Sequence, residues 1–152
     1  MQIHYFQSPI GILRLATEGD YLVEIRFSGK NEENTAGHPV LDRAAEQLSE
    51  YFVGARTEFD LPLKPEGSDF QKKVWDSLLT IRYGSTLTYM DLAKKLGDKN
   101  VIRAAGRANG QNPIPIIIPC HRVVGSNGHL TGYSGGIERK RWLLQHEGAL
   151  LL

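Results

Sequence analysis

The chain contains a single cysteine, Cys120, which stands in the run Pro119-Cys120-His121-Arg122. The thiolate is the nucleophilic form of cysteine, and a neighbouring base or positive charge raises the thiolate population. His121 could take the thiol proton directly or through a water molecule, and a third group would then orient the imidazole. These residue types therefore indicate a cysteine nucleophile with a histidine base.

A lone cysteine is more often a small buried hydrophobic residue, and His121 could equally be a hydrogen-bonded core histidine. Two neighbouring segments favour chemistry. Residues 112–119 contain three prolines around an isoleucine run, so we expect a rigid, buried, extended connector that fixes the position of Cys120. The glycine-rich segment 132–136 offers backbone N–H groups that could bind a carbonyl-like oxygen or the edge of a base.

The spacing of apolar residues predicts three helices before this connector. The first covers residues 68–81 and begins with a capping box formed by Ser68 and Gln71. The second begins after the N-cap residue Thr88, and the third covers residues 100–110. The last two helices are joined by about four residues and resemble a helix-turn-helix.

The third of these helices has a basic face of small residues, with Arg103, Gly106 and Arg107 opposite an apolar side. Glycine costs a helix on the order of 1 kcal/mol relative to alanine, so Gly106 indicates a backbone that lies close to a partner. DNA is the natural candidate. A helical hairpin with an exposed arginine face is an equally weighted alternative on these two helices alone.

Residues 1–65 predict strands followed by a helix. Apolar residues on both sides of the turn at residues 18–20 predict a meander or hairpin. A helical stripe runs from Val40 to Gly54. Residues 59–63 predict a short edge strand, because a proline within them cannot donate to a central ladder.

Composition excludes several classes of protein. The 152 residues are 41% hydrophobic and 23% charged, which excludes disordered and collagen-like chains. One cysteine excludes a disulfide scaffold and a multi-thiolate zinc or iron–sulfur site. The first residues do not resemble a signal peptide, and no stretch approaches the roughly 18 apolar residues of a membrane span. We therefore expect a cytoplasmic protein with no membrane partner.

The net charge of +1 hides an acidic half and a basic half. Residues 1–65 carry six Lys and Arg against ten Asp and Glu, a net charge of −4. Residues 66–152 carry twelve against seven, a net charge of +5. The charge division predicts two domains with these bounds and favours a polyanion partner for the second.

Several motifs together resemble the active-site pattern of the O6-alkylguanine-DNA alkyltransferases, also called methylated-DNA–protein-cysteine methyltransferases. The similarity is close over about residues 66–148, where the motifs occur in the family's order and spacing, and looser over residues 1–65. The matching segments are residues 70–75, 112–115, 119–123, 133–136 and 143–148, the helix that begins at Tyr89, and Arg103-Ala104-x-Gly106.

The resemblance implies an α/β protein of the α+β kind. Residues 1–65 would form a small N-terminal domain with an antiparallel sheet and a helix. Residues 66–152 would form a mostly helical domain with a helix-turn-helix of the winged-helix type, which binds DNA and accepts the alkyl group.

The resemblance also implies an irreversible reaction. After the base has flipped out of the duplex, Cys120 would attack the alkyl carbon on O6 of guanine and become S-alkylcysteine; O4 of thymine would be a second substrate. By matching position, His121 would be the base acting through a water molecule and Glu147 would orient it. Asn112 would brace the connector, and Tyr89 would donate a proton or hydrogen bond to N3 of the leaving guanine.

The same resemblance implies two groups of contacts with DNA. Arg103 would enter the duplex through the minor groove and fill the space left by the flipped base, which offsets part of the cost of extrusion. The residues implied for DNA binding are Lys99, Arg103, Ala104, Gly106 and Arg107, and those implied for the base pocket are Tyr89, Val123, Tyr133, Ser134 and Gly135.

We expect no cofactor and no metal, because His4 and His38 have no cysteine beside them in the N-terminal half. The expected partner is double-stranded DNA containing O6-alkylguanine, bound by a monomer, with cooperative binding along DNA left open. Two alternatives remain: a non-catalytic module that binds alkylated bases, against which Cys120 argues, and a helix-turn-helix transcription regulator, which would prefer one DNA sequence.

Overall fold

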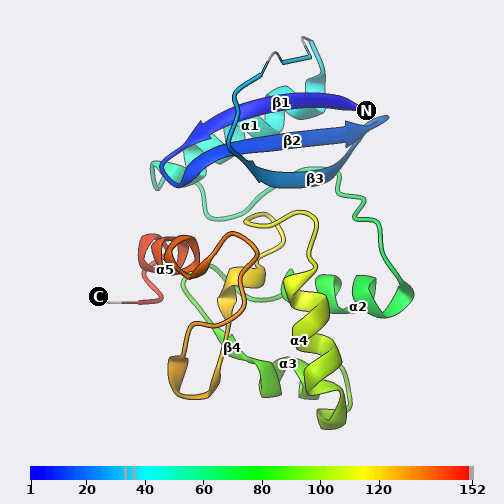
Figure 1. Cartoon of the computed structure of the whole chain (residues 1–152), viewed down its shortest axis with the longest axis vertical. Coiled ribbons are helices and arrows are strands. Elements are labelled where there is room, and N and C mark those ends of the chain that lie inside the picture. The colour runs from blue at the N-terminus through cyan, green and yellow to red at the C-terminus, as the bar shows by residue number, and fades with distance from the viewer. Residues whose placement is uncertain (33, 36, 151–152) are drawn as a thin grey trace. The chain divides into compact units, whose positions relative to one another are not determined.

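The computed structural model describes residues 1–32, 34–35 and 37–150 and divides into two compact units, Met1–Glu66 and Gly67–Leu152 (Figure 1). Strands dominate the first unit and helices the second, which confirms the predicted α+β class. No helix in the described part of the chain is long and apolar enough to cross a membrane.

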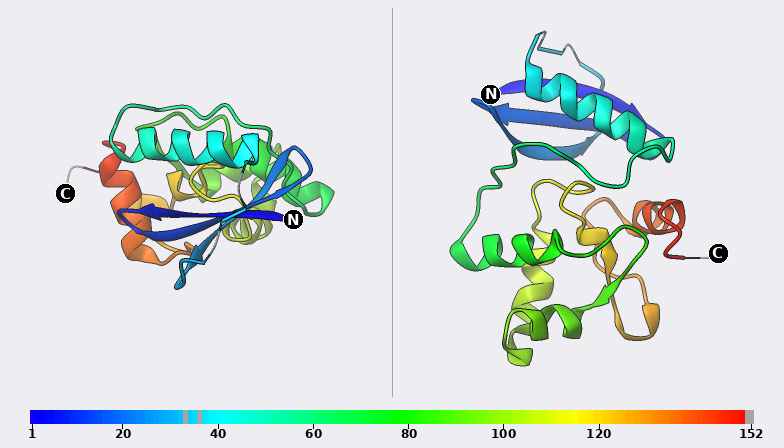
Figure 2. Two further views of the ribbon diagram at one scale, coloured as in Figure 1. Left: turned by 90° about the horizontal axis from the view of Figure 1, so that it is seen from above. Right: turned by 180° about the vertical axis from the view of Figure 1, so that it is seen from behind.

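The first unit is a three-stranded antiparallel meander covered on one face by a helix. The strands are β1 (Gln2–Ser8), β2 (Gly11–Glu18) and β3 (Tyr21–Ser28), paired in the order β1-β2-β3. Helix α1 (Pro39–Phe52) lies across the sheet, as the right-hand view of Figure 2 shows. The apolar side chains of α1 and of the strands form the core of this unit.

Helix α1 begins at an unusual N-cap, His38. Its Nδ1 accepts hydrogen bonds from the backbone N–H groups of Val40 and Leu41 at 3.2 and 3.5 Å. Its Nε2 lies 2.9 Å from the carbonyl oxygen of Gly19. Because Nδ1 accepts, Nε2 carries the proton and donates to that carbonyl. His38 is therefore a structural residue that ties the helix to a turn of the sheet.

The edge strand predicted over residues 59–63 is wrong in extent. The structure has only an isolated parallel bridge between Leu22 and Leu63. The backbone N–H of Leu22 donates to the carbonyl of Pro62 at 2.8 Å, and that of Lys64 donates to Leu22 at 2.9 Å. Pro62 accepts but cannot donate, so pairing stops after one residue.

The second unit contains four α-helices among its described residues: α2 (Asp69–Leu78), α3 (Tyr89–Lys95), α4 (Ile102–Gly110) and α5 (Ile137–His146). The capping box of Ser68 and Gln71 and the N-cap Thr88 are confirmed. The helix predicted over residues 68–81 ends three residues earlier, in a turn that still buries Ile81. The helix predicted over residues 100–110 is divided into the 3-10 turn η1 (Lys99–Val101) and α4.

Two short elements join distant parts of this unit. Strand β4 (Leu87–Thr88) pairs in parallel with β5 (Val123–Val124), which places the start of α3 next to the segment that follows Cys120. Helices α2 and α4 pack together, and the indole N–H of Trp75 donates to the carbonyl of Ala108 at 2.8 Å. The connector and the 3-10 turn η2 (Cys120–Arg122) follow α4.

Candidate active site

The connector over residues 112–119 is buried, as predicted, but it is not extended. The Asn112 amide donates to the carbonyl of Ile118 at 2.7 Å and accepts from the N–H of Ile114 at 3.0 Å. The N–H of Ile118 also donates to the carbonyl of Ile114 at 3.0 Å, so the segment closes on itself. Ile116 has a φ of 75°, a strained value for a β-branched residue. The prolines exclude a helix, but the side chain of Asn112 stabilises a compact turn instead.

Cys120 follows this turn and lies in a buried position at the start of η2. Cys120 is 4% exposed, and its carbonyl accepts from the side-chain amide of Asn109 at 3.4 Å. Burial raises the pKa of the thiol to about 11, although a hydrogen bond with Asn112 and the charge of Lys140 act in the opposite direction. At pH 7 the group is therefore a thiol. A base must remove its proton as the new bond to sulfur forms.

Glu147 is a buried carboxylate that joins His121 to Arg122. Its Oε2 lies 2.8 Å from Nε2 of His121. Arg122 donates from Nε to Oε1 at 2.8 Å and from Nη2 to Oε2 at 3.1 Å, a bidentate ion pair. Burial alone would raise the pKa of Glu147, but hydrogen bonds from His121 and Arg122 and the charge of the guanidinium lower it to about 2. The carboxylate is therefore ionised at neutral pH.

The Arg122 guanidinium also connects this cluster to the segment that follows α2. Its Nη1 donates to the carbonyl of Ile81 at 2.7 Å, beyond the end of α2, and the guanidinium carbon lies 5.7 Å from the centroid of the Tyr83 ring. Glu147 is the C-cap of α5. One guanidinium thus connects η2, the turn after α2 and the end of α5.

The hydrogen bond to Glu147 determines the tautomer of His121. A carboxylate can only accept, so Nε2 carries the proton. Burial lowers the pKa of His121, although Glu147 opposes this shift, so the ring is neutral and Nδ1 keeps its lone pair. Among the residues that the structure describes, Nδ1 is buried and has no hydrogen-bond partner. It is therefore available to accept a proton from a neighbouring group.

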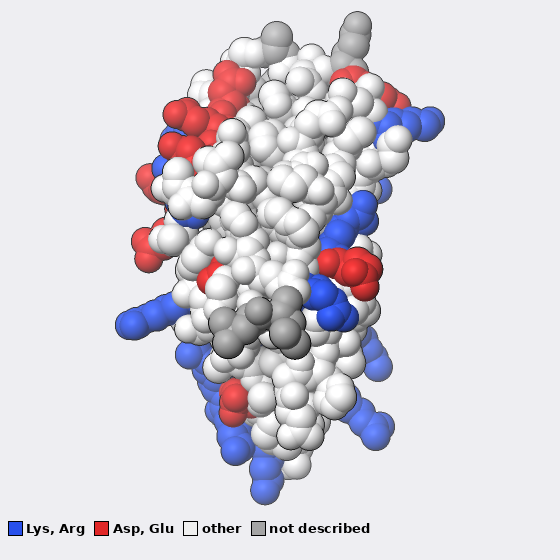
Figure 3. Space-filling view, turned by 90° about the vertical axis from the view of Figure 1, so that its left-hand side faces the viewer, with Lys and Arg blue, Asp and Glu red and all other residues white. Residues whose placement is uncertain are grey.

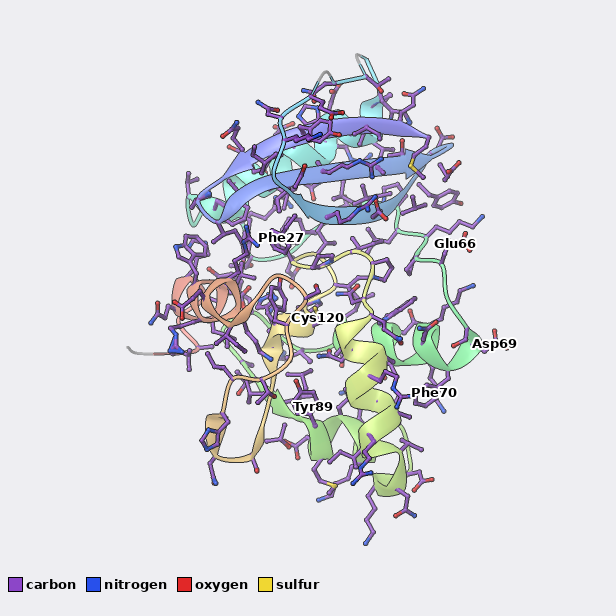
Figure 4. The ribbon with its side chains drawn as sticks, in the orientation of Figure 1. Phe27, Glu66, Asp69, Phe70, Tyr89 and Cys120 are labelled. Carbon is purple, nitrogen blue, oxygen red and sulfur yellow. The ribbon has the colours of Figure 1, made fainter. Side chains whose placement is uncertain are left out.

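Tyr89 begins α3, and Figure 4 labels it together with Cys120 at η2. The Tyr89 hydroxyl donates to the carbonyl of Thr131 at 3.1 Å. The same carbonyl accepts from Nζ of Lys140 at 2.8 Å, and this Nζ also donates to the carbonyl of Val123 at 2.6 Å. Two residues predicted for the base pocket, Tyr89 and Val123, are thus connected through Lys140.

The remaining predicted pocket residues differ in exposure. Tyr133 is buried, and burial raises the pKa of its hydroxyl well above the usual range. Ser134 is exposed and Gly135 is half-buried. These three precede α5 in the glycine-rich segment, which follows Thr131 directly.

The residues predicted to bind DNA lie on α4 and η1. The side chains of Lys99, Arg103 and Arg107 are exposed, as is Ala104. A Cβ at Gly106 would lie 3.5 Å from Cδ1 of Tyr89, an ordinary contact, so packing within the chain does not require a glycine there. In Figure 3, Lys and Arg side chains lie along the edges of the Gly67–Leu152 unit, and the face between them is mostly uncharged.

Sequence reasoning missed Lys140 and did not pair Arg122 with Glu147. Helical spacing places Lys140 on the same face of α5 as Leu143, Leu144 and the following Glu147. This i, i+3, i+4, i+7 pattern is the signal that could have identified a buried lysine. The structure brings Cys120, His121 and Glu147 into one buried region.

Both units of the chain match sequence models of one known family. A sequence model described as "6-O-methylguanine DNA methyltransferase, DNA binding domain" matches residues 69–149, and one described as "6-O-methylguanine DNA methyltransferase, ribonuclease-like domain" matches residues 1–65. The chain belongs to the O6-alkylguanine-DNA alkyltransferase family.

Individual relatives agree with this assignment. The chain is 49% identical over 152 residues to the methylated-DNA–protein-cysteine methyltransferase of Mycobacterium tuberculosis H37Rv, covering 95% of this chain and 92% of that protein. It is 45% identical over 150 residues to that of Methanosarcina acetivorans, covering 95% and 96%. The crystal structure of Mycobacterium tuberculosis OGT in complex with DNA is similar, with a TM-score of 0.89, 45% identity and coverage of 98% and 94%.

The buried ion pair predicts a large loss of stability in Glu147→Gln. The substitution leaves the Arg122 guanidinium buried without its counter-charge, which costs about 3–5 kcal/mol in the free energy of unfolding at pH 7. Because the pKa of Glu147 is lowered to about 2, its stabilising effect is full above its unfolded pKa, near 4.5, and is lost as the pH falls towards 2.

Urea unfolding of both proteins from pH 7 to pH 2.5 measures this difference. We expect the difference in the free energy of unfolding between the wild-type protein and Glu147→Gln to become smaller below pH 4.5. A gap that stays constant across this range would show that Glu147 does not act through its charge.

Proposed function

We propose that this chain repairs DNA by transferring an alkyl group from O6 of guanine to Sγ of Cys120. The observation that carries the proposal is a buried thiol that is followed in the chain by a buried, neutral imidazole, whose Nδ1 can accept a proton and whose Nε2 is held by Glu147. Membership of the alkyltransferase family supports the same conclusion. The protein acts as both reagent and catalyst.

The proposed reaction is a single SN2 displacement. Sγ attacks the alkyl carbon while the bond from that carbon to O6 breaks, and its electrons pass to the guanine. The thiol proton passes to Nδ1 of His121 through a water molecule, and the leaving guanine takes up one proton, which Tyr89 donates at N3. Water then carries a proton from His121 to Tyr89, so both side chains return to their neutral forms and the net transfer is one proton from the thiol to the guanine. The thioether is not cleaved by ordinary reductants, so each molecule acts once. O4-alkylthymine presents the same type of carbon and is the second proposed substrate.

The alkylated base must leave the duplex before it can react. An alkyl carbon inside the stack is inaccessible, and extruding the base costs a few kcal/mol, less for a damaged pair. The exposed Arg103 on α4 is proposed to fill the space that the base leaves. Lys99 and Arg107 are proposed to contact phosphates without reading sequence, next to the small residues Ala104 and Gly106.

The proposed pocket for the flipped base uses backbone groups of Cys120, Val123 and Ser134, with Tyr133 and Gly135 beside them. Asn112 is proposed to hold the connector that delivers the thiol, consistent with its two hydrogen bonds across that turn. The helix pair α3 and α4 is proposed to act as a helix-turn-helix. We propose that a monomer binds double-stranded DNA.

Intact mass measurement tests the reaction. After incubation with duplex DNA containing O6-methylguanine, the protein should gain one methylene, about 14 Da, once per molecule. The gain should be absent in Cys120→Ala. No gain in the wild-type protein, or a gain that persists in the alanine variant, contradicts the proposal.

The role of Arg103 predicts a difference between two substrates. Arg103→Ala should lower the rate of transfer from duplex DNA by about tenfold or more, which corresponds to about 1.4 kcal/mol of lost stabilisation. Transfer from the free base O6-benzylguanine should stay within about twofold, because no stack has to be filled. Single-turnover kinetics on both substrates measure the two rates.

Arg141→Ala is the matched control, since it removes the same charge from an exposed position on α5. We expect it to leave both rates close to those of the wild-type protein. Equal losses on the two substrates in Arg103→Ala would mean that Arg103 has a structural role.

A further inference from the structure

Lys140 is a buried ammonium whose partners are two backbone carbonyls. The residue is 0% exposed, on the inner face of α5. Its Nζ donates to the carbonyl of Val123 at 2.6 Å and to that of Thr131 at 2.8 Å. No carboxylate among the described residues forms an ion pair with it.

This arrangement is unfavourable for stability. Taking an ammonium out of water without a counter-charge costs free energy that two neutral carbonyls repay only in part. Burial lowers the pKa of Lys140 to about 8, although the nearby Cys120 opposes the shift. A methionine would fill a similar volume at lower cost. Lys140 lowers the stability of the fold at this buried position, and its contribution to the neighbouring site explains why a lysine is found there.

The two carbonyls mark the two ends of one loop. Val123 follows η2 and opens the loop, and Thr131 closes it immediately before the glycine-rich segment 132–136. Within the loop, the N–H of Gly125 donates to the carbonyl of His129 at 2.7 Å. Lys140 therefore bridges the base of the loop, and both anchored ends adjoin residues proposed to hold the flipped base.

We propose that Lys140 is a positioning residue for alkyl transfer: it bridges the two ends of the loop 123–131 and so fixes the Val123 carbonyl and the glycine-rich segment where the base binds. This inference rests on the proposed function. It assigns Lys140 no direct contact with the reacting atoms.

The hydrogen bond from Lys140 to the Thr131 carbonyl also allows Tyr89 to take up its proposed role. In the structure the Tyr89 hydroxyl donates to Thr131, and the ring centroid lies 5.9 Å from Nζ of Lys140. To donate to a guanine the hydroxyl must leave this carbonyl. Lys140 keeps the Thr131 carbonyl bonded when it does, so the end of the loop stays in place while Tyr89 changes partner.

Three measurements on Lys140→Met separate positioning from a general structural role. Thermal unfolding should give a melting temperature equal to or above that of the wild-type protein, because the buried charge is gone. Hydrogen exchange followed by mass spectrometry should show backbone amides of residues 124–132 exchanging about tenfold faster or more, with the helices unchanged. Single-turnover transfer from O6-benzylguanine should show about a tenfold rise in the half-saturating concentration, larger than the fall in the limiting rate.

Two further variants complete the experiment. Lys140→Gln restores a donor without the charge, and it should give loop exchange and half-saturating concentration between those of the wild type and Lys140→Met. Lys73→Met removes an exposed lysine from α2 and should match the wild type throughout.

Two results overturn the inference. One is a lower melting temperature in both Lys140 variants with faster exchange throughout the unit, which would make Lys140 a structural residue. The other is unchanged exchange in residues 124–132. If wild-type protein gains no methylene from O6-methylguanine DNA, the proposed function fails, while the exchange and melting data still decide whether Lys140 holds the loop.

Discussion

The buried carboxylate of Glu147 is the constraint on which the site depends. A carboxylate with no exposed side-chain surface is stable only if charged and hydrogen-bonding groups surround it, and Arg122 and His121 supply them. Meeting this requirement brings together the end of α5, the turn η2 and the carbonyl of Ile81. Because η2 begins with Cys120, the same interactions that satisfy one buried charge also fix the place of the proposed nucleophile.

The electrostatics of the site keep its two reactive groups neutral. Burial raises the pKa of Cys120 and lowers that of His121, so the resting pair is a thiol and an imidazole. In the proposed reaction, a single proton transferred from the thiol to the imidazole gives the thiolate that attacks the alkyl carbon. Glu147 is then placed to stabilise the imidazolium, in the way a third group orients and supports the base in a catalytic triad. A resting thiol suits the proposed protein, which reacts once.

Local sequence signals predicted the regular elements well and the buried polar contacts poorly. The caps at Ser68 and Thr88 and the helical stripes depend on residues close in the chain, and the structure confirms them. The connector over residues 112–119 closes because of one side chain, Asn112, which proline rules do not anticipate. The pairing of Glu147 with His121 came from family resemblance, and its ion pair with Arg122 was missed, since contacts across about 25 residues leave no periodic pattern. Lys140 was missed because a lysine is expected in solvent.

The proposed proton transfer depends on the protonation state of His121 in the resting protein. NMR of the protein with ¹⁵N-labelled histidine, recorded between pH 5 and pH 9, reports which ring nitrogen carries a proton. At pH 7 we expect a neutral ring with the proton on Nε2 and none on Nδ1, with protonation of Nδ1 only below the usual histidine pKa of about 6.5. An imidazolium at pH 7, or a neutral ring with its proton on Nδ1, would rule out the proposed proton transfer, because Nδ1 could not then accept the thiol proton.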